Sequence, residues 1–208
     1  MRKRWKAGLV ASLVAAGFAL SACAPLLVGA GATLGTLSAL DRRTVGAQTE
    51  DELIELKGRN RLTESMRNAG GIGVTSYNRK VLLTGQVLSA EDKSNATKVI
   101  ASMSNVRSVD NELQVSGRVS MGVSASDALI TTRVKTALLD SNRVQANTIK
   151  VVTEASVVYL MGIVTAAEGA AAADIASRAS GVARVVTVFE TISNDDLQRI
   201  KSEAEAKR

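Results

Sequence analysis

Histidine is absent from the 208 residues, and cysteine occurs once, at Cys23. Without histidine, the Ser/His/Asp and Cys/His nucleophile arrangements and every histidine-ligated metal site are excluded. A single cysteine excludes an internal disulfide and a thiolate cluster. After Cys23 the aromatic residues are Tyr77, Tyr159 and Phe189, too few for a platform that stacks single-stranded nucleic acid. We therefore expect no catalytic site, no metal ion and no nucleic-acid partner.

Residues 1–22 have the pattern of a secretory signal peptide. Four cations between Arg2 and Lys6 supply most of the net charge of +6 and leave +2 on the remainder. The apolar stretch 7–20 is 14 residues long, shorter than the ~20 that span a bilayer. Pro25 and the glycines after it disfavour the alternative, one uncleaved helix that continues to residue 40.

The segment ends in Leu20-Ser21-Ala22-Cys23, which resembles a lipobox. The resemblance implies that Cys23 becomes the first residue of the mature protein, with diacylglycerol on its sulfur and an acyl chain on its amino group. No other cofactor is expected. More than one acyl chain gives stable anchoring, because each buried CH₂ contributes ~0.8 kcal/mol. Ala24, rather than Asp, favours the outer membrane facing the periplasm, by analogy with lipoprotein sorting.

The rest of the chain contains one unit twice, at an offset of 76 to 77 residues. Two strands, 81–85 and 158–162, each enter a glycine, Gly85 and Gly162, and each is preceded by a second strand. Within strands, such glycines indicate a bulge or a close helix approach. Two helices then carry apolar residues at i, i+3, i+4 and i+7, namely Ala96, Val99, Ile100 and Met103 in one copy and Ala172, Ile175, Ala176 and Ala179 in the other.

Each unit starts with a further helix and ends with a further strand. The helices are expected over 51–68 and 126–140, with Ser126 or Asp127 capping the second, and the last strands over 109–115 and 184–192. A hairpin followed by a right-handed crossover makes the last strand parallel to the second. The fold class is therefore α+β, with two tandem α-β-β-α-β domains. Each domain has a three-stranded mixed sheet with two helices on one face.

Each of the two repeated units resembles the BON domain family. The chain as a whole resembles the outer-membrane lipoproteins that contain two BON domains. The matching stretches are 41–46, 74–77, 80–86, 130–135 and 171–178. The predicted organisation is a signal peptide 1–22, a lipidated Gly/Ala-rich tether 23–43, BON domain 1 over 44–117, a linker 118–125, BON domain 2 over 126–193 and a charged tail 194–208.

The resemblance implies that anionic phospholipid binds to the first helix of BON domain 2. Because Ile130, Val134 and Leu138 face the core, Leu129, Arg133 and Thr136 are expected to project outward, with Lys135 and Leu139 on the flank. The expected phospholipid-binding residues are Leu129, Arg133, Lys135 and Leu139. An apolar group that enters the acyl boundary beside cations that meet phosphates is what an interfacial helix needs. Family members carry tryptophan where this chain has Leu129, and leucine lacks the interfacial preference of indole. On pattern alone, the same helix reads as an ordinary amphipathic surface helix.

The family resemblance also implies a role in outer-membrane integrity, recruitment to division sites and links to the β-barrel assembly machinery. An alternative is a protein-binding scaffold for envelope assembly without direct lipid binding. A hydrolase would need a nucleophile activated without histidine, and no Ser-x-x-Lys falls at an expected cleft.

Overall fold

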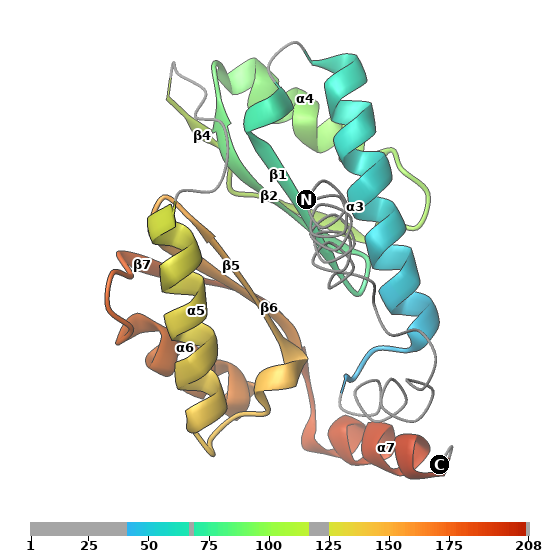
Figure 1. The fold of residues 1–208 in the computed structure, drawn as a ribbon. Coiled ribbons are helices and arrows are strands. Elements are labelled where there is room, and N and C mark those ends of the chain that lie inside the picture. The colour runs from blue at the N-terminus through green and yellow to red at the C-terminus, as the bar shows by residue number, and fades with distance from the viewer. Residues whose placement is uncertain (1–40, 67–68, 117–124, 207–208) are drawn as a thin grey trace, which may run out of the picture. The chain divides into compact units, whose positions relative to one another are not determined.

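The computed structural model describes residues 41–66, 69–116 and 125–206. Every described residue falls within the compact unit Ala39–Arg208 (Figure 1). The predicted signal peptide, Cys23 and most of the predicted linker lie outside the described residues. None of the helices described is long and apolar enough to cross a membrane.

One order of elements occurs twice, as the repeat predicts, so the α+β assignment is confirmed. The first copy contains α3 (Val45–Ser65), η1 (Ala69–Gly71), β1 (Ile72–Tyr77), β2 (Lys80–Val87), α4 (Ala90–Ala101), β3 (Ser108–Asn111) and β4 (Gln114–Val115). The second contains α5 (Ala125–Asp140), η2 (Ala146–Thr148), β5 (Ile149–Glu154), β6 (Val157–Thr165), α6 (Ala166–Ser177) and β7 (Arg184–Ile192). Helix α7 (Asn194–Glu205) follows, within the predicted charged tail.

Both sheets are mixed. The hairpin strands β1 and β2, like β5 and β6, are antiparallel, and the strand after the second helix of each copy runs parallel to the central strand. In the first copy this last strand is broken into β3 and β4, both paired with β2, where one strand over 109–115 was expected. The break follows from Asn111, whose side-chain oxygen accepts the Leu113 N–H at 3.0 Å, and from Leu113 itself, which turns into the core.

Two helix starts differ from the sequence-based expectation. Helix α3 begins at Val45, six residues before the expected start, because the Thr44 hydroxyl accepts the Ala47 N–H and so caps an earlier turn. Helix α5 begins at Ala125, so Ser126 and Asp127 lie inside its first turn and neither is the residue before the helix.

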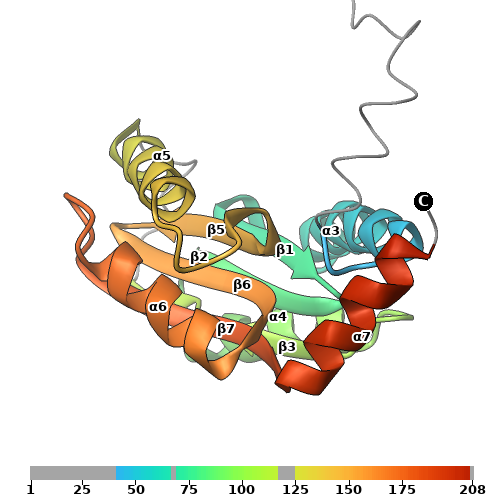
Figure 2. The ribbon, with the colours of Figure 1, turned by 90° about the horizontal axis from the view of Figure 1, so that it is seen from below.

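Each copy has its own core between its two helices and one face of its sheet. In the first copy Ile54 and Leu62 of α3 pack with Ile100 of α4 and with the central strand. In the second copy α5 lies over β5 and α6 over β6 and β7 (Figures 1 and 2). The predicted arrangement of two helices on one sheet face is therefore present in both copies.

The opposite faces of the two sheets share a third core, which the sequence did not reveal. It contains Tyr77 and Leu82 of the first copy together with Val157, Tyr159, Met161, Ile163 and Val188 of the second. The Tyr77 hydroxyl donates to the Thr148 carbonyl at 3.1 Å. All nine residues of β6 are buried, because this strand has a core on each face.

Gly85 and Gly162 permit a close backbone approach, one of the two expected roles. A Cβ on Gly85 would lie 1.9 Å from the Gly71 carbonyl oxygen, and one on Gly162 would lie 2.5 Å from that of Thr148. The approaching segment in each copy is the 3₁₀ turn before the first strand. Gly85 also has a φ of +105°, which disfavours any side chain there.

Candidate functional site

Helix α5 buries one face and exposes the opposite one. Ile130, Val134 and Leu138 are buried in the core of the second copy, as their spacing predicts. On the outward side, Leu129 and Leu139 are 57 % and 64 % exposed. Transfer of such side chains from water into an apolar phase is favourable, by roughly 25 cal/mol per Å² of apolar surface.

Arg133 is exposed and is held at one end by the turn between α6 and β7. Its Nη1 donates to the Ser180 carbonyl at 3.1 Å. Ser180 can lie this close to α5 because the next residue is Gly181, which has a φ of +93° and no side chain. A Cβ on Gly181 would lie 3.0 Å from the Ile130 side chain. A guanidinium has five N–H donors, so Arg133 retains donors for an anion while its position is fixed.

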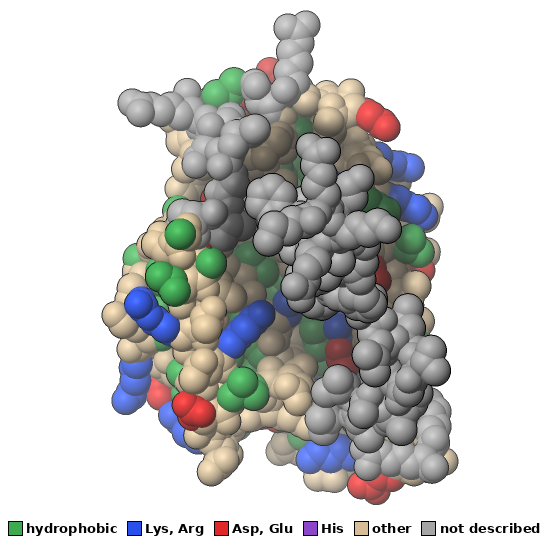
Figure 3. All heavy atoms as spheres, viewed as in Figure 1, with side chains coloured by type: hydrophobic (Ala, Val, Ile, Leu, Met, Phe, Trp, Pro, Cys, Tyr) green, Lys and Arg blue, Asp and Glu red, His purple; other side chains and the backbone are tan. Residues whose placement is uncertain are grey.

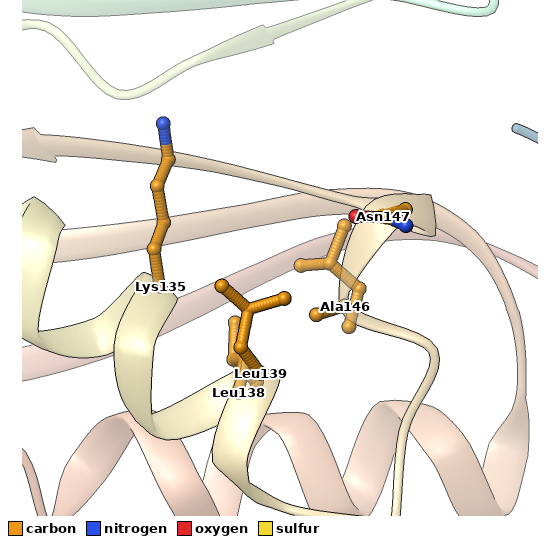
Figure 4. Close-up of a pocket in the computed structure, with 6 residues that line it drawn as sticks. Lys135, Leu138, Leu139, Ala146 and Asn147 are labelled. Carbon is orange, nitrogen blue, oxygen red and sulfur yellow. The ribbon is translucent and has the colours of Figure 1, made fainter. Parts of the chain in front are cut away.

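Lys135 borders a hollow of about 200 Å³ at the C-terminal end of α5 (Figure 4). The wall of the hollow is apolar on the helix side, where Leu138 and Leu139 lie, and continues to Ala146 and Asn147 at η2. In the close-up the Lys135 side chain extends away from the leucines with its amine outermost. The hollow therefore combines an apolar wall with one cation at its rim.

The four predicted residues form two pairs, one on each side of the outward line of α5, rather than one cluster. Residues two apart on a helix differ by about 200° in direction, so Arg133 and Lys135 lie on opposite sides of this line. Leu129 and Leu139, ten positions apart, differ by about 80°, so Leu129 lies on the side of Arg133 and Leu139 on the side of Lys135. Figure 3 shows Lys, Arg and hydrophobic side chains interspersed on this face of the molecule. Such a helix can lower its leucines into an acyl layer while its cations remain at the level of the phosphates.

Asp127, two residues before Leu129, is a buried structural group that sequence reasoning assigned only to a helix cap. Its carboxylate accepts the N–H groups of Ala155 and Ser156, each at 2.9 Å. Both turn residues have a positive φ, which the two hydrogen bonds stabilise without glycine. Asp51 accepts the two N–H groups of the matching turn in the first copy, each at 2.7 Å. The missed signal was an aspartate at the same position of both repeats.

Residues at the end of the predicted tether are joined to both copies. Arg42 donates to the Ile163 carbonyl at 2.7 Å and to both carboxylate oxygens of Glu168, at 2.9 and 2.5 Å. The Arg42 side chain is 4 % exposed. These hydrogen bonds lower the pKa of Glu168 to about 2, so this carboxylate stays charged at all physiological pH values. The contact spans 126 residues of sequence, and no local pattern indicates it.

Arg43 makes the corresponding contact to the first copy. Its guanidinium lies 4.0 Å from the centroid of the Tyr77 ring, and it donates to Asp41 and to Asp51 at 2.7 Å each. Burial raises the pKa of Tyr77 to about 12, with a further contribution from the nearby carboxylate of Asp41. Across the residues the structure describes, no group of three or more Asp, Glu, His or Cys side chains is placed to hold a metal ion.

Comparison with known proteins finds a family model in both halves of the chain. The BON domain model matches residues 50–117 and 126–192, the two stretches that contain the repeated elements. The chain is 38 % identical over 183 residues to the outer membrane lipoprotein DolP of Haemophilus influenzae, which covers 87 % of this chain and 94 % of that protein.

A second relative is a 21 kDa hemolysin of Actinobacillus pleuropneumoniae, 32 % identical over 155 residues, covering 74 % of this chain and 80 % of that protein. Among solved structures, CdsD, a structural protein of the type III secretion system of Chlamydia trachomatis, is 12 % identical with a TM-score of 0.29. The match covers 70 % of this chain and 96 % of that one.

Proposed function

Since the chain belongs to the BON-domain family and carries two copies of the domain, we propose that it is an outer-membrane lipoprotein, facing the periplasm, that binds anionic phospholipid through α5. The relative named DolP, similar over nearly its whole length, supports the outer-membrane location. In this proposal the protein acts through contacts, supports outer-membrane integrity and performs no catalysis. Division-site proteins and the β-barrel assembly machinery are its proposed protein partners.

The outward face of α5, with one leucine and one cation on each side, is the observation that carries the lipid assignment. Leu129 and Leu139 are more than half exposed, and Arg133 and Lys135 flank them. Each cation near an anionic surface contributes ~1 kcal/mol, and each leucine adds apolar transfer energy. Neither contribution alone gives firm binding, but an acyl anchor on Cys23 would hold the helix at the bilayer and make the contact effectively intramolecular.

The lipid contact is tested with the fragment that begins at Ala39, which retains every described contact of the compact unit. Its co-sedimentation is measured with phosphatidylcholine vesicles that contain or lack phosphatidylglycerol, at low and high salt. We expect binding that requires the anionic lipid, weakens with salt and falls about tenfold on Leu129→Glu with Arg133→Glu.

A matched control makes the same change of charge elsewhere on the surface. Leu88 is 42 % exposed and Lys98 is exposed. Leu88→Glu with Lys98→Glu should leave vesicle binding within about twofold of that of the unmodified fragment. The twofold margin allows for the long-range effect of the added negative charge, which salt screens. Unchanged binding of the α5 variant would reject the lipid assignment and leave the protein-binding scaffold. Anchoring is tested separately, by the mass of the membrane-extracted protein, which should begin at Cys23 and carry acyl chains.

A further inference from the structure

Exposed large apolar side chains are concentrated on two helices of the described chain. Of the seven that are at least 40 % exposed, three lie on α3 and two on α5: Val45 at 64 %, Leu53 at 40 % and Leu56 at 52 % on α3, and Leu129 and Leu139 on α5. Helix α3 is the first helix of the first copy and α5 the first helix of the second, so these side chains occur on the same element of the repeat.

The two helices match residue by residue at an offset of 76. Their buried positions correspond throughout, with Asp51, Ile54, Gly58 and Leu62 on α3 and Asp127, Ile130, Val134 and Leu138 on α5. In this register Leu53 occupies the position of Leu129. A cation follows four residues later in both helices, and a second cation follows six residues later.

The outward line of α3 is uncharged, as that of α5 is. At about 100° per residue, Leu53 and Leu56 point outward together with Thr49 and Asn60, and all four are exposed. Of the exposed cations, Lys57 lies beside Leu53 and Arg59 beside Leu56, and the exposed acids Glu52 and Glu64 also border the line. The line therefore presents two leucines together with hydroxyl and amide groups, and each leucine has a cation beside it.

The central stretches of the two faces carry the same net charge. Residues 53–61 carry three cations and one acid, Glu55, for a net +2, and the matching residues 129–137 carry Arg133 and Lys135, also +2. Glu55 accepts the Ser76 N–H at 2.9 Å and pairs with Lys150 at 2.7 Å, so its charge is largely neutralised inside the fold. The exposed acids Glu52 and Glu64 lie just outside this stretch, so the excess of cations on α3 is confined to residues 53–61.

We propose that α3 is a second bilayer-contacting helix, whose ridge of Leu53 and Leu56 enters the acyl boundary of an anionic membrane beside Lys57 and Arg59. The inference rests on the proposed function of α5, because it transfers that chemistry to the other copy of the repeat. A bilayer is favoured over a protein groove by the uncharged outward line and by the cation beside each of its leucines, Lys57 beside Leu53 and Arg59 beside Leu56. Helix α3 also begins 22 residues after Cys23, the proposed anchor, so it is the described helix next to the anchor along the chain.

A tryptophan placed on the ridge reports insertion directly. The sequence has one tryptophan, Trp5, which the fragment from Ala39 lacks, so Leu53→Trp gives a protein with a single tryptophan, which is excited selectively at wavelengths that tyrosine does not absorb. Leu53 is exposed, and the substitution leaves the core intact. With vesicles containing phosphatidylglycerol its emission should shift to shorter wavelength, with Leu129→Trp as the positive control and Leu88→Trp as the negative control.

The charge-reversed pair Leu53→Glu with Lys57→Glu copies the α5 variant at the matching positions. We expect it to lower vesicle binding about tenfold, and the combination of both pairs to lower binding further than either alone. An emission shift for Leu129→Trp without one for Leu53→Trp, or full binding by the Leu53 and Lys57 variant, overturns the inference while α5 keeps its function. Loss of both shifts overturns both proposals, and a shift at Leu53 alone rejects the α5 assignment.

Discussion

Gly85 is the position where one added methyl group should do most damage to the first domain. The residue sits in β2, paired with Ile72 of β1, and its φ of +105° is one that side chains rarely adopt. A Cβ would lie 1.9 Å from the Gly71 carbonyl oxygen, so backbone must move. Because β2 is the central strand, that movement cannot be confined to a loop.

The cost of Gly85→Ala has two parts. Holding alanine at a left-handed φ costs about 1–2 kcal/mol. Moving the Gly71 carbonyl out of the way weakens about two backbone hydrogen bonds of the turn and ladder, at about 0.5–1.5 kcal/mol each. The sum, about 2–5 kcal/mol, is a large part of the 5–15 kcal/mol that stabilises a typical domain.

Urea unfolding of the fragment from Ala39 measures this loss as a lower transition midpoint. Gly162→Ala is the matched variant: it meets the Thr148 oxygen at 2.5 Å but has no positive φ, so it should cost less than Gly85→Ala. Gly46→Ala, in exposed helix with nothing nearer than 3.9 Å, should raise stability by about 0.5–1 kcal/mol. A Gly85→Ala protein as stable as wild type, or more stable than Gly162→Ala, would refute the reasoning.

Two further predictions concern titration. Because Arg42 lowers the pKa of Glu168 to about 2, the stability from this pair is complete above the unfolded pKa near 4.5 and is lost as pH falls from there towards 2. Arg42→Ala should return the pKa of Glu168 towards 4.5, which an NMR titration of its side-chain carboxyl measures. An unmoved pKa would show that Arg42 is not the cause of the shift. Burial raises the pKa of Tyr77 to about 12, so the stability from this group is present below pH 10 and should be lost as pH rises from 10 towards 12. Burial also raises the pKa of Tyr159. Ultraviolet titration at pH 10 should show less tyrosinate in the folded protein than after urea unfolds it, and equal tyrosinate in the two states would contradict this.

The sequence alone determined the repeated unit and its internal order. Apolar residues at helical spacing identified the buried side of α5, and the matching glycines Gly85 and Gly162 indicated a close approach in both copies. These features could be predicted because side chains repeat in direction every 3.6 residues in a helix and every 2 residues in a strand, so the buried face is visible in the local sequence. The exposure of Leu129 on the outward side and of Leu139 on the flank followed from the same periodicity, whereas their contact with lipid stays a proposal.

The predicted element bounds and the role of Asp127 were wrong where a polar side chain hydrogen-bonds to a backbone N–H group. Asn111 breaks the last strand of the first copy by capturing the Leu113 N–H, and Thr44 starts α3 earlier than its apolar spacing suggests. Asp127 was assigned to a helix cap, whereas it braces a turn 28 residues away. A side chain of this kind has several possible partners, and the sequence does not state which one it meets.

Only the tertiary structure decided what covers the second face of each sheet and where residues 41–43 attach. Tyr77 reaches Thr148, and Arg42 reaches Glu168 across 126 residues of sequence. Contacts of this kind join residues far apart in the sequence, so they depend on two surfaces being complementary to each other. The repeated sequence pattern therefore determined the fold of each copy. The packing of the two copies against each other depended on the complementarity of two surfaces, which no single stretch of sequence contains.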